Sequence, residues 1–149
     1  MIRLLQQSFD PGAELSAFCQ GRQEVGAVAS FTGIARAEQG RTETLELEAY
    51  PGFTEAAIGE IAREAETRFG LQAYLILHRV GAIAPGEPIV FVATASAHRR
   101  EAFEACDFLM DYLKSRAPFW KKETGPDGSR WIEPRASDLT DLARWETKP

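Results

Sequence analysis

The sequence contains few cysteines and histidines, and neither type is arranged as a set of metal ligands. Cys19 and Cys106 lie far apart without a CxxC spacing, and there are only two histidines. A structural zinc site or a disulfide framework is therefore not expected, and a reducing cytoplasm is the expected location. Helical spacing to Phe103, Met110 and Leu113 predicts that the second thiol belongs to the core.

Long apolar runs and a basic surface are also missing. No run approaches the roughly 20 residues that span a bilayer, and the opening MIRLLQQSFD lacks the apolar region of a signal peptide. A formal net charge of −5 argues against a general nucleic-acid-binding protein. With 149 residues, 44% of them hydrophobic, the chain is predicted to form one domain over residues 1–149 that can bury a core.

Strands and helices are predicted to alternate along the chain. Asp10 and Pro11 have the types expected at a helix N-cap and first helical position. Strands are expected at residues 2–7, 24–36, 42–50, 71–83, 87–97, 119–123 and 130–134, and helices at 10–20, within 50–70 and at about 99–116. Several strands follow one another directly, and TGPDGS has the composition of a hairpin turn. An α+β fold with largely antiparallel sheets is therefore expected. Residues 37–41 have the composition of a mobile loop.

Residues 96–101, SAHRRE, put three basic side chains where a strand runs into a helix. Free backbone N–H groups and the positive end of the helix dipole make such a position an anion site. Because a cation opposes that dipole, a negatively charged ligand such as a phosphate would explain His98, Arg99 and Arg100. The alternative is a solvated cluster whose charges are compensated by glutamates in the first helical turns.

A second candidate site is FTGIAR, residues 31–36, where a strand reaches Gly33 and then presents Arg36. A glycine near a strand end is typical of a bulge or of a close approach between backbone and ligand. It is equally typical of a simple turn, so this stretch alone leaves both interpretations open.

The third candidate is MDYLKSRAPFWKKE, residues 110–123. Pro118 ends the preceding helix, and Lys114 lies on its last turn, where a cation suits the helix dipole. The dipole does not explain Lys121, which follows in an extended run whose side chains alternate. One face of this run carries Phe119, Lys121 and Glu123, and the other carries Trp120 and Lys122. Like charges and an apolar wall lower a lysine pKa, so we predict an anion-binding pocket with one or two reactive lysines.

Several stretches together resemble a known family. In chain order they are FTGIAR, EAYPGFTE, HRVGAIAPGE, IVFVATASAHRREAFEACDFLMDYLKSRAPFWKKE and RWIE. This pattern resembles the large catalytic subunits of molybdopterin synthase over about residues 25–145, with SAHR, MDYLK and APFWK as its most specific motifs. The resemblance implies a hammerhead-type α+β fold with about three helices. It also implies conversion of cyclic pyranopterin monophosphate into molybdopterin, by installing a dithiolene, with no bound cofactor or metal.

The resemblance also assigns roles to individual residues. Lys114 and Lys121 match the two catalytic lysines of the family, beside the sulfur donor and the pterin. The matched substrate-binding and pocket-lining positions are Phe31, Arg36, His98, Arg99, Met110, Lys122, Glu123 and Arg135, the last of which also matches a basic residue at the dimer interface. Ile34 and Ala35 stand where some relatives carry a more polar pair before the arginine. A side-chain contact from Ile34 to substrate is therefore not expected, whereas a backbone contact stays compatible with the sequence.

The implied partner is a small ubiquitin-like subunit whose C-terminal Gly-Gly tail threads into the large subunit and carries sulfur as a thiocarboxylate. Two large subunits would form the central homodimer of a heterotetramer. The pocket would be shared, with His98 and Arg99 from one subunit and Arg36, Lys114 and Lys121 from its mate. No nucleic-acid or membrane partner is expected. Two rival classes are a phosphate-ligand enzyme that forms a lysine Schiff base, and a non-catalytic scaffold that docks a ubiquitin-like protein.

Overall fold

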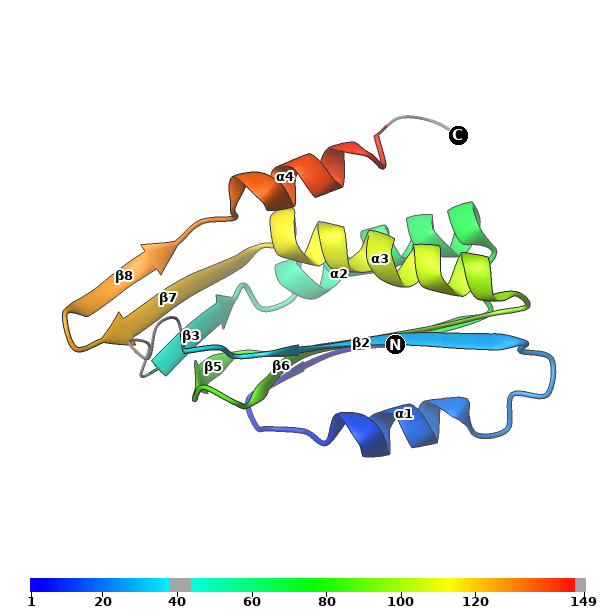
Figure 1. Ribbon diagram of the computed structural model, residues 1–149, viewed down its shortest axis with the longest axis horizontal. Helices are drawn as coiled ribbons and strands as arrows, with labels where there is room; N and C mark the ends of the chain where they lie inside the picture. Colours follow the sequence, from blue (N-terminus) through cyan, green and yellow to red (C-terminus); the bar gives the residue numbers. More distant parts are fainter. Residues whose placement is uncertain (38–43, 147–149) are drawn as a thin grey trace.

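Two four-stranded sheets organise the part of the chain that the computed structural model describes, residues 1–37 and 44–146 (Figure 1). The first sheet has the order β1 (Ile2–Leu5), β4 (Ala73–Arg79), β6 (Pro88–Ser96) and β2 (Ala27–Ile34). The second has the order β5 (Gly81–Ile83), β3 (Thr44–Ala49), β7 (Phe119–Gly125) and β8 (Gly128–Ile132). Only β1 and β4 pair in parallel among these described strands. The predicted α+β class with largely antiparallel sheets is confirmed.

Helices cover both faces of the first sheet. α1 (Pro11–Cys19) lies on one face, and α2 (Phe53–Phe69) and α3 (Arg99–Ser115) lie on the other, with α4 (Ala136–Ala143) against α3 (Figure 1). Residues of β6 therefore alternate between two cores. Val90 and Val92 pack with α2 and α3, whereas Phe91 and Ala93 pack with Phe18 of α1. Burial on both faces explains why this strand is continuously apolar in sequence.

Local sequence signals account for several element boundaries. The Asp10 side chain accepts hydrogen bonds from the backbone N–H groups of Gly12 and Ala13, at 2.9 and 3.2 Å, so the predicted N-cap of α1 is confirmed. Gly70 ends α2 in the left-handed conformation, at φ 62°, which a glycine adopts without strain. The predicted hairpin is the pair β7 and β8, whose register closes at Gly125 and Gly128.

Two sequence expectations are wrong. The described residues contain four helices instead of about three, because α4 forms from ASDLTDLA, whose Ser, Asp and Thr residues are weak helix formers. Its Leu142 is only 3% exposed, so packing against the core stabilises this helix.

Phe103 is 66% exposed and does not belong to the core, whereas Cys106 is buried as predicted. At 3.6 residues per turn, Phe103 lies about 100° away from the buried position 102. The expected loop at residues 37–41 lies, after position 37, outside the described residues.

α3 spans the first sheet from end to end and positions the candidate site. The helix begins just after β6 and ends just before β7, so its C-terminal end lies where the two sheets meet (Figure 1). Among the helices of the described residues, none combines the length and the apolarity needed to cross a membrane.

Candidate functional site

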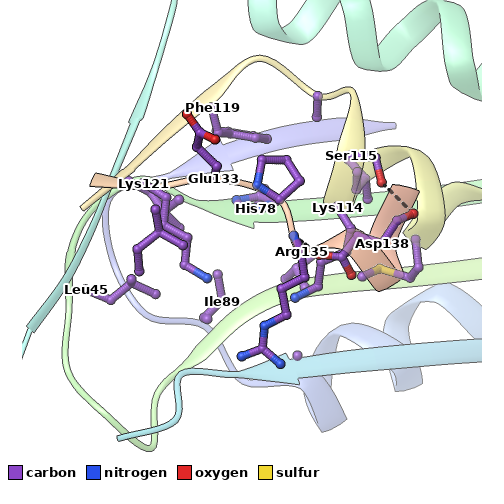
Figure 2. Close-up of a pocket in the computed structure, with 18 of the residues that line it drawn as sticks. Leu45, His78, Ile89, Lys114, Ser115, Phe119, Lys121, Glu133, Arg135 and Asp138 are labelled. Atoms are coloured by element: carbon purple, nitrogen blue, oxygen red, sulfur yellow. Dashed lines mark hydrogen bonds between the residues drawn. The ribbon is translucent and has the colours of Figure 1, made fainter. Parts of the chain in front are cut away.

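A cavity of about 610 Å³ opens beside the C-terminal end of α3 (Figure 2). Its wall is built from the ends of β2, β6 and α3, from β3, β4, β7 and β8, and from the segment between positions 133 and 138. Leu45, Leu47 and Ile89 supply apolar surface. The junction of the two sheets thus brings together side chains from distant parts of the sequence.

Lys114 and Lys121 reach this cavity from two different elements. Lys114 projects from the last turn of α3, and Lys121 is the third residue of β7. The turn between them is fixed by Thr54, whose hydroxyl donates to the Pro118 carbonyl at 2.9 Å and accepts the N–H of Tyr50 at 2.8 Å. Thr54 is fully buried, so breaking these bonds would leave polar groups unpaired away from water. Thr54 therefore anchors the backbone segment that separates the two lysines.

The side chains of β7 alternate as predicted. The cavity-lining residues of this strand are Phe119, Lys121 and Glu123. On the opposite face, Trp120 is 51% exposed, and the Lys122 ammonium lies 5.8 Å from the centre of the Trp131 ring. Lys122, which was expected to flank the substrate, therefore does not line the cavity of its own chain.

Basic side chains outnumber acidic ones on the cavity wall. The basic residues that line it are Arg36, Lys114, Lys121, Arg130 and Arg135, and the acidic residues are Glu123, Glu133 and Asp138. One carboxylate is neutralised directly, because Arg130 donates to Glu123 at 3.0 Å. This balance favours anions, whose attraction to the wall is strengthened where water is partly excluded.

Arg36 follows an irregularity in the pairing of β2 with β6. The register shifts between Gly33 and Ile34, because Gly33 pairs with Val90 and Ile34 pairs with Pro88, which leaves Ile89 of β6 as the extra residue. A Cβ atom at Gly33 would lie 2.7 Å from a methyl group of Val90, which explains the requirement for glycine. Backbone hydrogen bonds of 2.8 and 2.7 Å tie Ala35 to residues 86–87 and fix the chain just before Arg36.

Phe31, Met110 and Arg135 also line the cavity. Arg135 is the N-cap residue of α4, and its backbone N–H donates to the Asp138 carboxylate at 2.9 Å. The hydroxyl of Ser115 donates to the carbonyl of Asp138 at 3.1 Å, which ties α4 to the end of α3 (Figure 2). The sequence gives no sign that Ser115, Asp138 and Arg130 belong to the site. Their place in it depends on where α4 and β8 pack in the folded chain.

His98 and Arg99 lie at the opposite end of α3 and do not line the cavity. With a rise of about 1.5 Å per residue, Arg99 and Lys114 are separated by about 22 Å along the helix axis. Both residues at this end are exposed, and His98, the N-cap residue, makes no side-chain capping bond. A single chain therefore unites both lysines with Phe31, Arg36, Met110, Glu123 and Arg135, but it does not bring His98, Arg99 or Lys122 to them.

His78 is a candidate residue that sequence reasoning missed. It lies near the end of β4, is 8% exposed, and lines the cavity. Its ring stacks on Phe119, with ring centres 4.0 Å apart and 19° between the planes. Burial, and then the positive charges of Lys114 and Lys121, lower the pKa of its imidazole to about 4, although a hydrogen bond to the Arg79 carbonyl opposes this. The sequence feature that could have indicated this residue is its position directly after the largely apolar run LQAYLIL, residues 71–77.

Neither cysteine lines the cavity. Cys19 is exposed, and Cys106 is buried, where burial raises the pKa of its thiol to about 12 and suppresses the reactive thiolate. Among the described residues, no group of three or more His, Cys, Asp and Glu side chains could hold a metal ion. The ionisable groups that line the cavity are therefore its amines, guanidinium groups and carboxylates, with one imidazole.

Known proteins share the sequence pattern and the fold of this chain. The sequence model of the MoaE protein family matches residues 4–116. A molybdopterin synthase catalytic subunit from Caulobacter vibrioides is 70% identical over 146 residues, which cover 98% of this chain and 97% of the relative. A solved MoaE protein from Burkholderia ambifaria has a TM-score of 0.84 at 46% identity, with 99% of each chain covered. Molybdopterin synthase from Staphylococcus aureus has a TM-score of 0.78 at 30% identity, over 87% of this chain and 94% of that one. The chain therefore belongs to the MoaE protein family.

Proposed function

We propose that this chain is the catalytic subunit of a molybdopterin synthase and that the cavity at the end of α3 is its active site. Its relatives are molybdopterin synthase catalytic subunits, which transfer sulfur in molybdenum cofactor biosynthesis. The substrate is cyclic pyranopterin monophosphate, and the sulfur comes from the C-terminal thiocarboxylate of a small ubiquitin-like subunit. The observation that carries the proposal is the convergence of Lys114 and Lys121 on one cationic cavity.

The reaction requires two anions to meet, because the pterin carries a phosphate and the donor ends in a thiocarboxylate. Their mutual repulsion must be offset at the site, and Arg36, Arg135 and the two lysines supply positive charge from different sides. Fixed charges act more strongly in a partly dry cavity than in water. A lysine amine beside the reacting atoms can then move a proton or act as a nucleophile.

The donor tail must enter the cavity in an extended form to bring its terminus to the lysines. Extended peptides commonly bind through backbone hydrogen bonds, with pockets for alternate side chains. A Gly-Gly terminus has no side chains beyond hydrogen, so it can pass close to the apolar wall formed by Leu45, Leu47 and Ile89. The partner subunit is therefore expected to dock outside the cavity and to insert only its tail.

We also propose that His98 and Arg99 act in the cavity of a second copy of the chain. Their separation of about 22 Å from Lys114 exceeds the reach of one small substrate within a single chain. In a two-fold dimer each interface contact occurs twice, so every dimer would contain two such composite sites. In this arrangement the exposed basic side chains at the start of α3 would contact a ligand. The helix itself does not require basic residues at this end, because a cation opposes its dipole.

The direct test is formation of the dithiolene product from the purified chain, the cyclic pterin and a thiocarboxylated small subunit. Lys114→Ala and Lys121→Ala should each lower the rate by about a hundredfold or more, since each removes a positioned amine. Arg63→Ala is the matched control, because Arg63 is exposed on α2 and does not line the cavity. Unchanged turnover in both lysine variants would contradict the proposal.

Two further variants separate charge from amine chemistry. Lys114→Arg and Lys121→Arg keep the positive charge, but a guanidinium does not deprotonate at neutral pH. They should bind substrate and remain inactive if the amine takes part in the chemistry. Lys122→Ala removes the same charge one residue further along β7, from the opposite face, and should cost less activity than Lys121→Ala.

The same materials distinguish the two rival classes. A phosphate-ligand enzyme with a lysine Schiff base would give a borohydride-trapped adduct with a carbonyl substrate. A non-catalytic scaffold would retain its biological activity in both lysine variants as long as the small subunit still bound.

A further inference from the structure

The ring of His78 is held by two fixed contacts. One face stacks on Phe119, and Nδ1 lies 2.8 Å from the carbonyl oxygen of Arg79. A carbonyl oxygen can only accept a hydrogen bond, so Nδ1 carries the proton and donates it. In the neutral ring Nε2 is then the nitrogen with an accepting lone pair. The stack sets the plane of the ring and the backbone bond sets its rotation, so together they fix the direction of Nε2.

The charges of both candidate lysines act on this imidazole. Lys114 and Lys121 line the same cavity as His78, and their ammonium groups, after burial, keep its pKa low enough that the ring is uncharged at neutral pH. The other charged side chains on the cavity wall are the cations Arg36, Arg130 and Arg135 and the carboxylates Glu123, Glu133 and Asp138. Arg79, the neighbour of His78 in β4, is itself paired with Glu87 at 2.8 Å. A neutral acceptor in the cavity that both ammonium groups line can orient a lysine without adding charge.

We propose that His78 is a positioning residue of the lysine pair, whose Nε2 accepts a hydrogen bond from the ammonium group of Lys114 or Lys121. This inference depends on the proposed function only in the catalytic role that it assigns to the two lysines. A hydrogen bond to the charged form of an amine stabilises that form and raises the lysine pKa. The neighbouring cations act in the opposite direction. His78 would therefore set both the direction of the amine and the pH at which it loses its proton.

Two substitutions separate the stacking of the ring from its nitrogen chemistry. His78→Phe keeps an aromatic ring against Phe119 and removes the acceptor. His78→Gln removes the aromatic stack and keeps an amide oxygen that can accept. If acceptance by Nε2 matters, the NMR titration curve of one lysine should move to lower pH in the Phe variant and stay close to the wild-type curve in the Gln variant. A residue that served packing alone would show neither change.

The lysine titrations can be followed directly by NMR on protein labelled with ¹³C-lysine. The chain contains only four lysines, and Lys122, on the opposite face of β7, provides an internal control whose titration should not move. The readout does not depend on turnover. A shifted lysine with no dithiolene product would therefore refute the proposed function and leave this inference standing.

A measurement on the wild-type protein keeps the proposal testable whatever the stability of the variants. Imidazole ¹⁵N shifts at pH 7 should show His78 neutral and protonated at Nδ1. Protonation at Nε2, or a charged ring at this pH, would overturn the proposal. It would also be overturned by unmoved titrations of Lys114 and Lys121 in His78→Phe, or by an equal fall in His78→Gln.

Discussion

Acid should destabilise this protein through the imidazole of His78. In the folded protein, burial and the charges of Lys114 and Lys121 lower the pKa of this group from 6.5 to about 4. In the unfolded chain it has its ordinary value. Between pH 6.5 and 4 the unfolded chain therefore binds a proton that the folded protein does not, so the free energy of unfolding falls as the pH falls. Above pH 6.5 the group is neutral in both states and contributes no pH dependence.

The size of the effect follows from the difference between the two pKa values, about 2.5 pH units. At 1.36 kcal/mol per unit this corresponds to about 3 kcal/mol, reached once the pH is below both values. Because the side chain is 8% exposed, screening by solvent takes away little of it. Single domains are stable by roughly 5–15 kcal/mol, so this one group could remove a substantial part of the total.

Urea unfolding at pH 7, 6, 5 and 4 measures the loss, with protein concentration held constant because association would alter apparent stability. Trp145 contacts Phe69 and Phe108 in the core, so its fluorescence should report unfolding. Carboxylates titrate over the same range, and His78→Phe corrects for them because it removes only the imidazole. The wild-type protein should lose about 3 kcal/mol more than this variant between pH 7 and pH 4. Equal losses in the two proteins would refute the reasoning.

Three further predictions test the shared site, the partner and the support of β7. The first mixes His98→Ala/Arg99→Ala protein with Lys114→Ala protein and exchanges their subunits by partial unfolding and refolding. About a quarter of wild-type activity should return, because about half of the dimers are mixed and each mixed dimer has one intact site. No recovery after verified exchange would exclude a shared site. A small subunit without its last two glycines should dock more weakly and transfer no sulfur, and product formation with that truncated subunit would contradict tail insertion. Thr54→Val should lower the free energy of unfolding by about 1–3 kcal/mol, since it leaves buried partners unpaired. Thr54→Ser, which keeps the hydroxyl, serves as its control, and equal unfolding curves for the two variants would show that these bonds contribute little.

Features with a local cause could be predicted from the sequence. The Asp10 cap depends on its own helix end, and the alternation around Lys121 depends only on the extended backbone. The register shift beside Gly33 arises within one strand pair, and the sequence named a bulge there as one of its open interpretations. In each case the deciding interaction lies within a few residues or one strand pair, so the sequence pattern carries the information.

Features that depend on long-range docking could not be predicted in this way. α4 is a poor helix by composition and is stabilised by burial of Leu142 and by the tether between Ser115 and Asp138. His78 becomes a cavity residue only because β4 ends where α3 and β7 meet. The separation of Arg99 from Lys114 follows from helix length, but the sequence does not show which end of α3 adjoins the cavity described above.

The charges of the cavity favour completion of the site by a second chain. Among the described residues that line it, five are basic and three acidic, a net charge of +2 when all are ionised. A cyclic phosphate diester and a thiocarboxylate each carry one negative charge, which matches that value. A lysine that acts as base or nucleophile must be neutral when it does so, and the net charge of the wall then falls to +1. Protonating His78 would restore the balance, but at a buried position where adding the proton at pH 7 costs about 4 kcal/mol. Arg99 of a dimer mate, at the positive end of its own helix dipole, could supply the missing charge without that cost.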